Sequence, residues 1–557
     1  MADQLGMVTA AEEATRAGDR AAAAERWQAV VEVNPVNGIF WCRLGLARFE
    51  TGDHSGALDA YRKAAELGVW PIGYWAPLPP IFPGELTYEI ARCHGALGDR
   101  EAAFEALVQA VGEGLREPGR ARTDLALLSD DPRFDDVVGA ARPAEPAKPA
   151  GSTESASRVE KWRADLRFLR AEIARRIPRP EILDADFRAA ADGLDHDVPD
   201  LDDAGIVIGI WRLLRRLGDG HAWVDADERY PEWNRSLPVW FYAFHDGLLV
   251  TETDPRFRHL AGAEVLTVDG HPVAEVFDAL DPLFTRDNDY APAVQGPMWL
   301  RRPAYLHAVG MADRPDGVTL TVRPPGGSVT DVRVPADPVV EALTSANTRP
   351  RPWPWNCPPG SVRPSFETPA YLRDVDNPFW FEHQKAGNLV YFQFNGVRDK
   401  DDDTLAACYE RVFAAVAEHD ARALVIDMRW NGGGNTFLGQ TLVHHVLRHP
   451  DLPVFVVIGG CTFSAAQNTV TLLDRHTHAV FVGEPTGSAP SFVGESVPFT
   501  LPESGIRVNV SDLYWQTGWP FDHRVAVAPR IYTPLTAADY LAGRDPAMDA
   551  VREHLAL

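Results

Sequence analysis

Residues 423–435 read ALVIDMRWNGGGN, an apolar run that ends in three consecutive glycines. An uninterrupted apolar run predicts a strand buried on both faces, as in a parallel sheet covered by helices. The glycines allow the backbone to turn sharply and to expose successive N–H groups where the next helix begins. Such groups bind an anion, or a carbonyl oxygen that becomes negative in a transition state. An ordinary strand-to-helix turn is the alternative interpretation.

The segments around this stretch alternate between strand and helix patterns. Short apolar runs predict strands, and amphipathic spacings of three or four residues predict helices. Besides 423–428, strands are expected at 389–394, 454–458 and 479–483, and helices at 404–419, 436–447 and 465–473. This alternation is typical of an α/β core with a parallel sheet, which we place at residues 381–557.

Ser464 stands at a second strand-to-helix turn. The strand expected at 454–458 runs into Gly459 and Gly460, and Ser464 opens the following helix. A serine there lies at the positive end of the helix dipole, and the N–H of Ala465 beside it can join an anion-binding site. An ordinary N-cap serine would occupy the same position.

His221 follows a glycine-rich helix end. A helix is expected at 204–217, and the sequence Gly218-Asp-Gly stops it directly before His221. A histidine at such a place sits on a loop, where its side chain can face a cleft. A histidine that only caps the loop is the alternative.

Five short motifs together resemble a serine peptidase family, the one that includes the tricorn core protease and the C-terminal processing peptidases. In chain order they are LGDGH at 217–221, LVIDMRWNGGG at 424–434, TFSAA at 462–466, VGEPTG at 482–487, and the tail VAPRI at 527–531 with GRDP at 543–546. The resemblance covers residues 158–557. It implies that the α/β core is of the ClpP/crotonase type.

The tricorn-like branch of this family implies a nucleophilic serine, a histidine base and a late acidic residue. The resemblance places the nucleophile at Ser464, the base at His221 and the orienting acid at Asp522. A serine hydroxyl needs such a base, and a carboxylate behind the histidine fixes its tautomer. The family more often has glutamate where Asp522 stands. The backbone N–H groups of Gly433 and Ala465 would form the oxyanion hole.

The other branch, the C-terminal processing peptidases, implies a Ser–Lys dyad. No lysine follows Ser464 in this sequence, so the dyad is excluded on that stretch. Glu484 remains an alternative for the acid, and His523 remains an alternative for the base. No cofactor or metal is expected, because His476 and His478 lack an evident third ligand.

Residues 1–139 follow a helical repeat pattern. Gly-Asp turns precede comparable helices that begin at Ala23, Ala57 and Ala103, and the first two lie 34 residues apart. This period resembles that of the tetratricopeptide repeat, in which Tyr61 would fill the gap between repeats. A generic array of helical hairpins is the alternative.

Three further segments lie between the repeats and the core. Residues 140–157 are rich in proline, alanine and serine and are expected to form a linker. Residues 158–225 are expected to form a small helical bundle that carries His221. Residues 226–380 show an order of strand, strand, helix and strand that resembles a divergent PDZ-like α+β module. The predicted fold class is therefore multidomain, with all-α repeats, a bundle, an α+β module and an α/β core.

Composition narrows the class of partner. The 54 lysines and arginines against 79 aspartates and glutamates give a net charge of −25, which opposes binding to nucleic acid or to an anionic membrane. The five cysteines are scattered and suggest no disulfide framework. Neither a secretory signal nor an apolar run long enough for a bilayer is evident, so we expect a cytoplasmic protein.

The leading hypothesis is a serine peptidase whose repeats recruit a protein substrate or partner. A non-proteolytic peptide- or ligand-binding protein on the same scaffold is one alternative. An esterase or tailoring hydrolase of a biosynthetic pathway is another, since it would use the same acyl chemistry. The sequence leaves cleavage preference and oligomeric state open.

Overall fold

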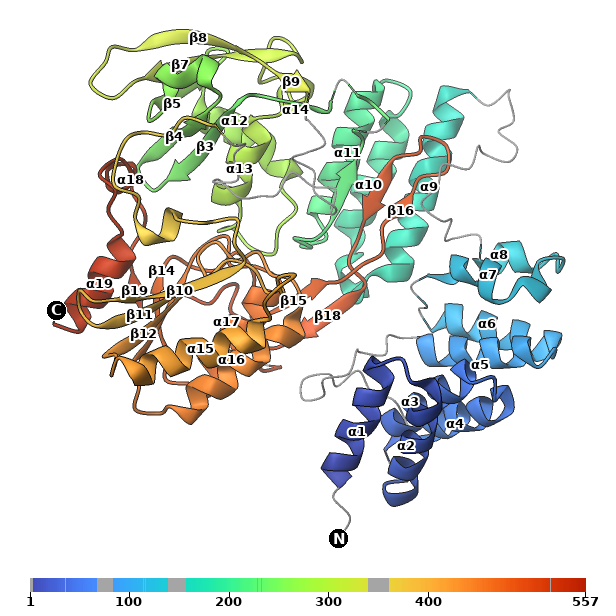
Figure 1. Cartoon of the computed structure of the whole chain (residues 1–557). Helices are drawn as coiled ribbons and strands as arrows, with labels where there is room; N and C mark the ends of the chain where they lie inside the picture. Colours follow the sequence, from blue (N-terminus) through green and yellow to red (C-terminus); the bar gives the residue numbers. More distant parts are fainter. Residues whose placement is uncertain are drawn as a thin grey trace. The chain divides into compact units, whose positions relative to one another are not determined.

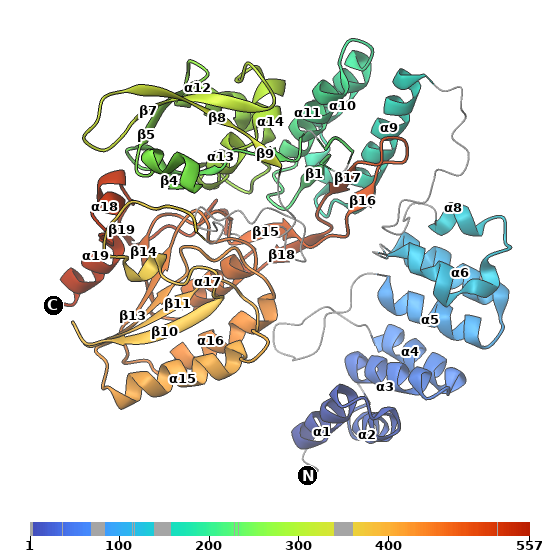
Figure 2. The same ribbon diagram turned by 45° about the horizontal axis from the view of Figure 1, so that its top comes forward.

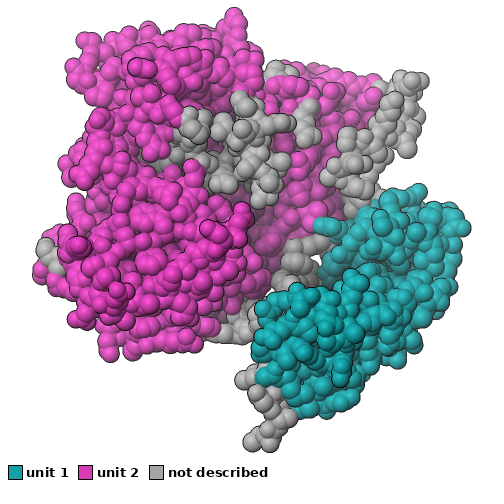
Figure 3. All heavy atoms as spheres, viewed as in Figure 1, with its two compact units in different colours: residues 1–150 teal, residues 151–557 magenta. Residues whose placement is uncertain are grey.

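The computed structural model describes most of the chain, which forms two compact units, residues 1–150 and 151–557 (Figure 3). The residues that the description leaves out are 1–3, 36, 68–83, 114, 116, 139–156, 228, 232, 339–359, 521 and 557. The predicted linker at 140–157 therefore lies almost entirely outside the described residues.

Unit 1 is helical, and each long helix packs against its neighbour along the chain (Figure 1). The helices are α1 (Gln4–Arg16), α2 (Arg20–Val33), α3 (Gly38–Glu50), α4 (His54–Leu67), α5 (Glu85–Ala96), α6 (Arg100–Gly112), α7 (Ala121–Asp124) and α8 (Phe134–Val138). Asp19 of the first Gly-Asp turn caps α2 by accepting a hydrogen bond from the N–H of Ala22. Tyr61 is fully buried, and a Cβ atom on Gly45 would lie 2.7 Å from its ring. The close approach of α3 and α4 therefore requires the glycine.

Unit 2 begins with three helices that lead to His221. They are α9 (Arg158–Arg176), α10 (Ala185–Asp197) and α11 (Asp203–Arg215). The short strand β1 (Trp223–Asp225) follows and pairs with β17 (Arg507–Asn509), which pairs in turn with β16 (Phe499–Thr500). Figure 2 shows these strands beside α9. The sheet thus fastens the loop that carries His221 to a part of the chain almost 300 residues later.

The next part of unit 2 is an antiparallel sheet with helices packed on it. Its strands, in the order in which they pair, are β3 (Val239–Phe244), β4 (Gly247–Thr253), β5 (Glu264–Val268), β7 (Gly317–Arg323) and β8 (Thr330–Pro335). The helices α12 (Val273–Leu280), α13 (Pro292–Leu300) and α14 (Pro303–Ala308) lie between β5 and β7 in the sequence. One apolar core joins this sheet to the helices before it, with Leu169, Ile210, Val250 and Val508 among its buried members.

The last part is a six-stranded sheet with helices on both faces. Its strands pair in the order β10 (Phe379–Gln384), β11 (Leu389–Phe394), β12 (Ala423–Asp427), β13 (Val454–Ile458), β14 (Val480–Gly483) and β19 (Ile531–Tyr532). The strands from β11 to β19 are parallel, and β10 is antiparallel to β11. One face packs on α15 (Leu405–Glu418), α16 (Thr436–Arg448) and α17 (Ala465–His476), and the other packs on α19 (Pro546–His554). Both glycine-rich turns therefore follow the carboxyl ends of neighbouring strands, where sites in parallel sheets are built.

A buried ion pair joins the first of these turns to the last helix. The guanidinium of Arg429 contacts Asp427 at 2.8 Å and Asp545 at 2.9 Å. Asp545 also caps α19 by accepting from the backbone N–H groups of Ala547 and Met548. The charged side chains of two sequence motifs thus fix where the chain turns after β12.

Candidate active site

Ser464 occupies a strained turn between β13 and α17. Its φ and ψ angles are +56° and −125°, a region that residues other than glycine rarely adopt and that costs on the order of 1–3 kcal/mol. Its side chain makes no capping hydrogen bond to the helix that it precedes, unlike an ordinary N-cap serine. A sharp strand-to-helix turn of this kind exposes the nucleophilic hydroxyl in α/β-hydrolases.

The imidazole of His221 lies against this hydroxyl. Nε2 of His221 is 3.0 Å from Oγ of Ser464, although the two residues are 243 positions apart in the chain. Within this distance a histidine can take a proton from a serine. The structure thus brings together two of the residues that the sequence singled out.

Neighbouring groups hold His221 on its backbone and on its ring. The N–H of His221 donates to Asp219 at 2.9 Å, and Asn509 donates to the carbonyl oxygen of His221 at 2.8 Å. The rings of Phe463 and Phe492 lie near the imidazole, with centroids at 4.5 and 5.9 Å from it. Burial raises the pKa of Asp219, and hydrogen bonds from Ser511 and the backbone oppose this rise.

Gly433 and Ala465, the expected oxyanion-hole residues, are neighbours in space. A Cβ atom on Gly433 would lie 2.7 Å from Cβ of Ser464 and 2.8 Å from the backbone nitrogen of Ala465. The N–H of Gly433 donates to Oδ1 of Asn431 at 3.0 Å. In the described part of the chain no acceptor is paired with the N–H of Ala465. The N–H of Ala465 is therefore available to bind an anion, whereas the N–H of Gly433 is bound to the side chain of Asn431.

Gly433→Ala should lower kcat by at least a hundredfold. The added methyl overlaps Ser464 and Ala465, and φ at this residue is +104°, which disfavours any side chain. Loss of a single oxyanion donor alone costs about 3 kcal/mol of barrier. Steady-state kinetics on the folded variant would check this. Gly326→Ala is a matched control, because φ is +67° there and no atom lies within 4 Å of the added methyl; equal kcat in both variants would contradict the expectation.

Asp522, the expected orienting acid, is engaged by a nearby arginine. Its carboxylate accepts from Nε and Nη2 of Arg524 at 2.9 and 2.7 Å, and Arg524 also contacts Asp474 at 2.8 Å. These hydrogen bonds hold the pKa of Asp522 below its usual value. The described hydrogen bonds of the Asp522 carboxylate come from Arg524 and not from His221.

Glu484, the alternative acid, and His523, the alternative base, lie in different environments. Burial raises the pKa of Glu484, and the charges of Arg429 and His245 oppose this rise. His523 is exposed, and the described hydrogen bond of Ser464 is made with His221 instead.

Sequence reasoning missed the residues that hold His221 in place. Asp219 stands inside the LGDGH motif, so the motif itself could have indicated a structural carboxylate there. Nothing in the local sequence marks Asn509 or Phe492, because their roles depend on the pairing of β1 with β17 and on chain far from His221.

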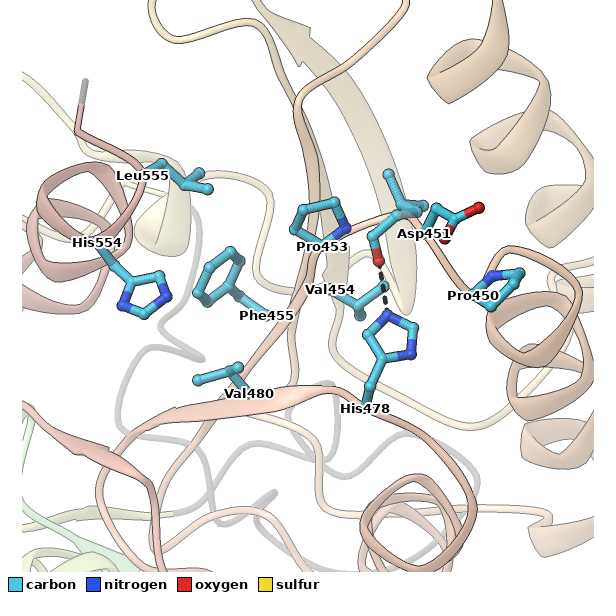
Figure 4. Close-up of a pocket in the computed structure, with 10 residues that line it drawn as sticks. Pro450, Asp451, Pro453, Val454, Phe455, His478, Val480, His554 and Leu555 are labelled. Atoms are coloured by element: carbon cyan, nitrogen blue, oxygen red, sulfur yellow. Dashed lines mark hydrogen bonds between the residues drawn. The ribbon is translucent and has the colours of Figure 1, made fainter.

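A pocket elsewhere in unit 2 is separate from this site (Figure 4). It has a volume of about 460 Å³ and is lined by residues around the start of β13, with His478, His554 and Leu555. Nε2 of His478 lies 2.7 Å from the carbonyl oxygen of Leu452. Because Ser464 follows the opposite end of β13, the pocket and the Ser464–His221 pair lie at different edges of the sheet.

The described residues show neither a metal cluster nor a membrane span. No three His, Cys, Asp or Glu side chains among them come together as ligands of an ion. None of the helices that the structure describes is both long and apolar enough to cross a bilayer.

Two of the comparisons with known proteins find similarity, one to a repeat family and one to solved structures. Residues 8–68 match the family model of the tetratricopeptide repeat, which confirms the repeats predicted at the start of the chain. No curated protein matches the chain.

Solved structures resemble this chain over about 70% of its length. The complex of mature CPAF with lactacystin has a TM-score of 0.52 at 16% identity and covers 72% of this chain and 98% of that chain. Mature CPAF by itself has a TM-score of 0.51 at 16% identity and covers 72% of this chain and 97% of that one. The photosystem II D1 C-terminal processing protease aligns at 14% identity over 69% of this chain and 98% of that one, with a TM-score of only 0.34. The chain thus contains a tetratricopeptide repeat region and shares the fold of mature CPAF over 72% of its length.

Proposed function

We propose that this protein is a serine hydrolase that cleaves peptide bonds through an acyl-enzyme on Ser464. The observation that carries the proposal is the 3.0 Å contact between Nε2 of His221 and Oγ of a serine held in a strained turn. A serine used only as a helix cap would have relaxed angles and a capping hydrogen bond. The shared fold is consistent with this chemistry but does not by itself carry it.

The proposed reaction begins when Oγ of Ser464 attacks the carbonyl carbon and Nε2 of His221 takes the hydroxyl proton. The negative oxygen of the tetrahedral intermediate accepts from the N–H of Ala465, and from Gly433 once that group leaves Asn431. His221 then gives the proton to the departing amine, and the acyl group stays on Ser464. Water, activated by the same histidine, releases the acid.

The proposal extends to the modules around the site. The antiparallel sheet of β3 to β8 acts as the PDZ-like module, and the six-stranded sheet acts as the ClpP/crotonase-type core. The peptide lies between them as an added strand. The repeats of unit 1 recruit the protein substrate or a partner, and the protein works in the cytoplasm.

A fluorophosphonate probe tests the proposal directly. An activated serine displaces fluoride from phosphorus, so we expect one adduct on the wild-type chain, located at Ser464 by peptide mapping. Ser464→Ala should remain unlabelled. Absence of any adduct on the wild-type protein would favour the non-proteolytic binding protein.

Matched peptide amides and esters then separate the two kinds of hydrolase. Release of amines from a peptide library by the wild-type protein, and not by Ser464→Ala, supports the peptidase. Cleavage of esters with no cleavage of any amide would instead support the esterase or tailoring hydrolase.

In this proposal Asp522 is still the residue that orients His221. Its place along the chain supports this role, and its carboxylate must first leave Arg524. Asp522→Asn should then lower kcat by on the order of 10³ to 10⁴, because the histidine loses its tautomer partner. Glu484→Gln is the matched comparison, since it removes the charge of the rival acid. Kinetics that show a loss for Glu484→Gln and none for Asp522→Asn would transfer the role to Glu484.

A further inference from the structure

The loop between α12 and α13 touches the backbone on both sides of His221. Oδ1 of Asp287 accepts from the N–H of Gly220 at 2.7 Å. The hydroxyl of Thr285 donates to the carbonyl oxygen of Ala222 at 2.6 Å. His221 is therefore the middle residue of a tripeptide whose two ends are bound by one loop.

The same loop binds two turns of the core that carries Ser464. The hydroxyl of Ser488 donates to Oδ2 of Asp287. Nδ2 of Asn288 donates to the carbonyl oxygens of Thr486 at 2.9 Å and of Val525 at 2.8 Å. Each carboxylate oxygen of Asp287 thus has its own partner, one on the histidine loop and one on the turn after β14.

Packing leaves little freedom at this point. A Cβ atom on Gly220 would lie 2.8 Å from Oδ1 of Asp287 and 2.9 Å from the ring of Phe463, the residue directly before Ser464. Gly220 is therefore pressed between Asp287 and the turn that presents the nucleophile. Burial, with the nearby charge of Asp219, raises the pKa of Asp287 to about 7, which fits a carboxyl group that is held for its hydrogen bonds.

We infer that Asp287 is a positioning residue. By tying the histidine loop to the turn after β14, it sets the distance between Nε2 of His221 and Oγ of Ser464. The inference rests on the proposed function, in which the rate of proton transfer from Ser464 to His221 depends on that distance. His221 and Ser464 come from different segments, and neither segment alone fixes the 3.0 Å distance between them. A misplacement of about 1 Å in such a pair costs on the order of a hundredfold in rate.

Three variants test the inference. Asp287→Ala removes both hydrogen bonds and should lower kcat by tenfold or more, with KM changed by less than twofold. Asp287→Asn should restore kcat to within threefold, because its amide can accept from Gly220 and donate to Ser488. Asp165→Ala is the control, since Asp165 is buried and accepts from two backbone N–H groups at 2.8 Å, on Glu503 and Ser504. It should lose comparable stability and keep kcat within twofold.

A readout independent of activity completes the design. Amide hydrogen exchange should become faster in the peptide containing residues 220–222 in Asp287→Ala, and stay unchanged there in Asp165→Ala. If Asp287→Ala does not fold, Thr285→Val removes only the hydroxyl bond to Ala222 and should lower kcat severalfold.

Equal kcat for Asp287→Ala and Asp165→Ala, or unchanged exchange at 220–222, would overturn the positioning role. Failure of the proposed function looks different, because the wild-type protein itself would then take no fluorophosphonate and cleave no substrate.

Discussion

Ser464→Ala is expected to abolish measurable hydrolysis, with kcat lower by on the order of a millionfold. The methyl group cannot attack a carbonyl carbon, whereas the backbone N–H groups beside it remain. Alanine must adopt the same φ of +56°, so the variant should unfold close to the wild-type temperature. Kinetics on a cleaved peptide and thermal unfolding, measured on the same preparation, would check both expectations.

Ser464→Gly serves as the control for this first prediction. Glycine adopts a positive φ without steric cost, so the variant should be as inactive as Ser464→Ala yet more stable by about 1 kcal/mol. A gain in stability in Ser464→Gly and none in Ser464→Ala would show that any side chain at this φ strains the turn. Substantial activity in either variant would contradict the assignment of Ser464.

His221→Ala is expected to have an effect on kcat close to that of Ser464→Ala, on the order of 10⁴- to 10⁶-fold. Without the imidazole at 3.0 Å, the serine hydroxyl has no base and keeps its proton. KM should change little, since the side chain acts on the proton and not on the remote parts of the substrate. The second-order rate of fluorophosphonate labelling would report the same loss without turnover.

His523→Ala is the comparison for the histidine. His523 is exposed and was the rival base on the sequence, so its removal should leave both kcat and labelling near the wild-type values. The reverse outcome, with an active His221→Ala and an inactive His523→Ala, would exchange the two assignments.

The main features of the fold follow from local sequence. The apolar runs at 423–428 and 454–458 predicted the buried strands β12 and β13 to within one residue, because a strand covered on both faces has no polar side. The repeats of unit 1 were predictable because their period and turn residues recur. Strand β10 and the two-stranded sheet of β15 (Ser491–Gly494) and β18 (Leu513–Gln516) were not predicted, since their residues mix polar and apolar types.

The candidate site was predictable in part. The residue types and their order indicated Ser464 and His221, but a sequence does not reveal the φ angle of Ser464 or its contact with His221, which argue against a plain helix cap. Asp522 illustrates a second limit. An arginine two positions later can hold an aspartate as firmly as a histidine could, and linear spacing does not distinguish the two partners.

The ribosome synthesises His221 well before β17, the strand that pairs with β1 just beyond that histidine. Ser464 is also synthesised before β17, so the unfinished polypeptide holds both groups without the sheet that fastens the loop of His221. Contacts between such distant segments form late, because a long loop must close first. On the proposed function, the nascent chain is therefore inactive as a hydrolase until β17 has been synthesised and has paired with β1. The order of synthesis thus protects neighbouring proteins from the unfinished chain.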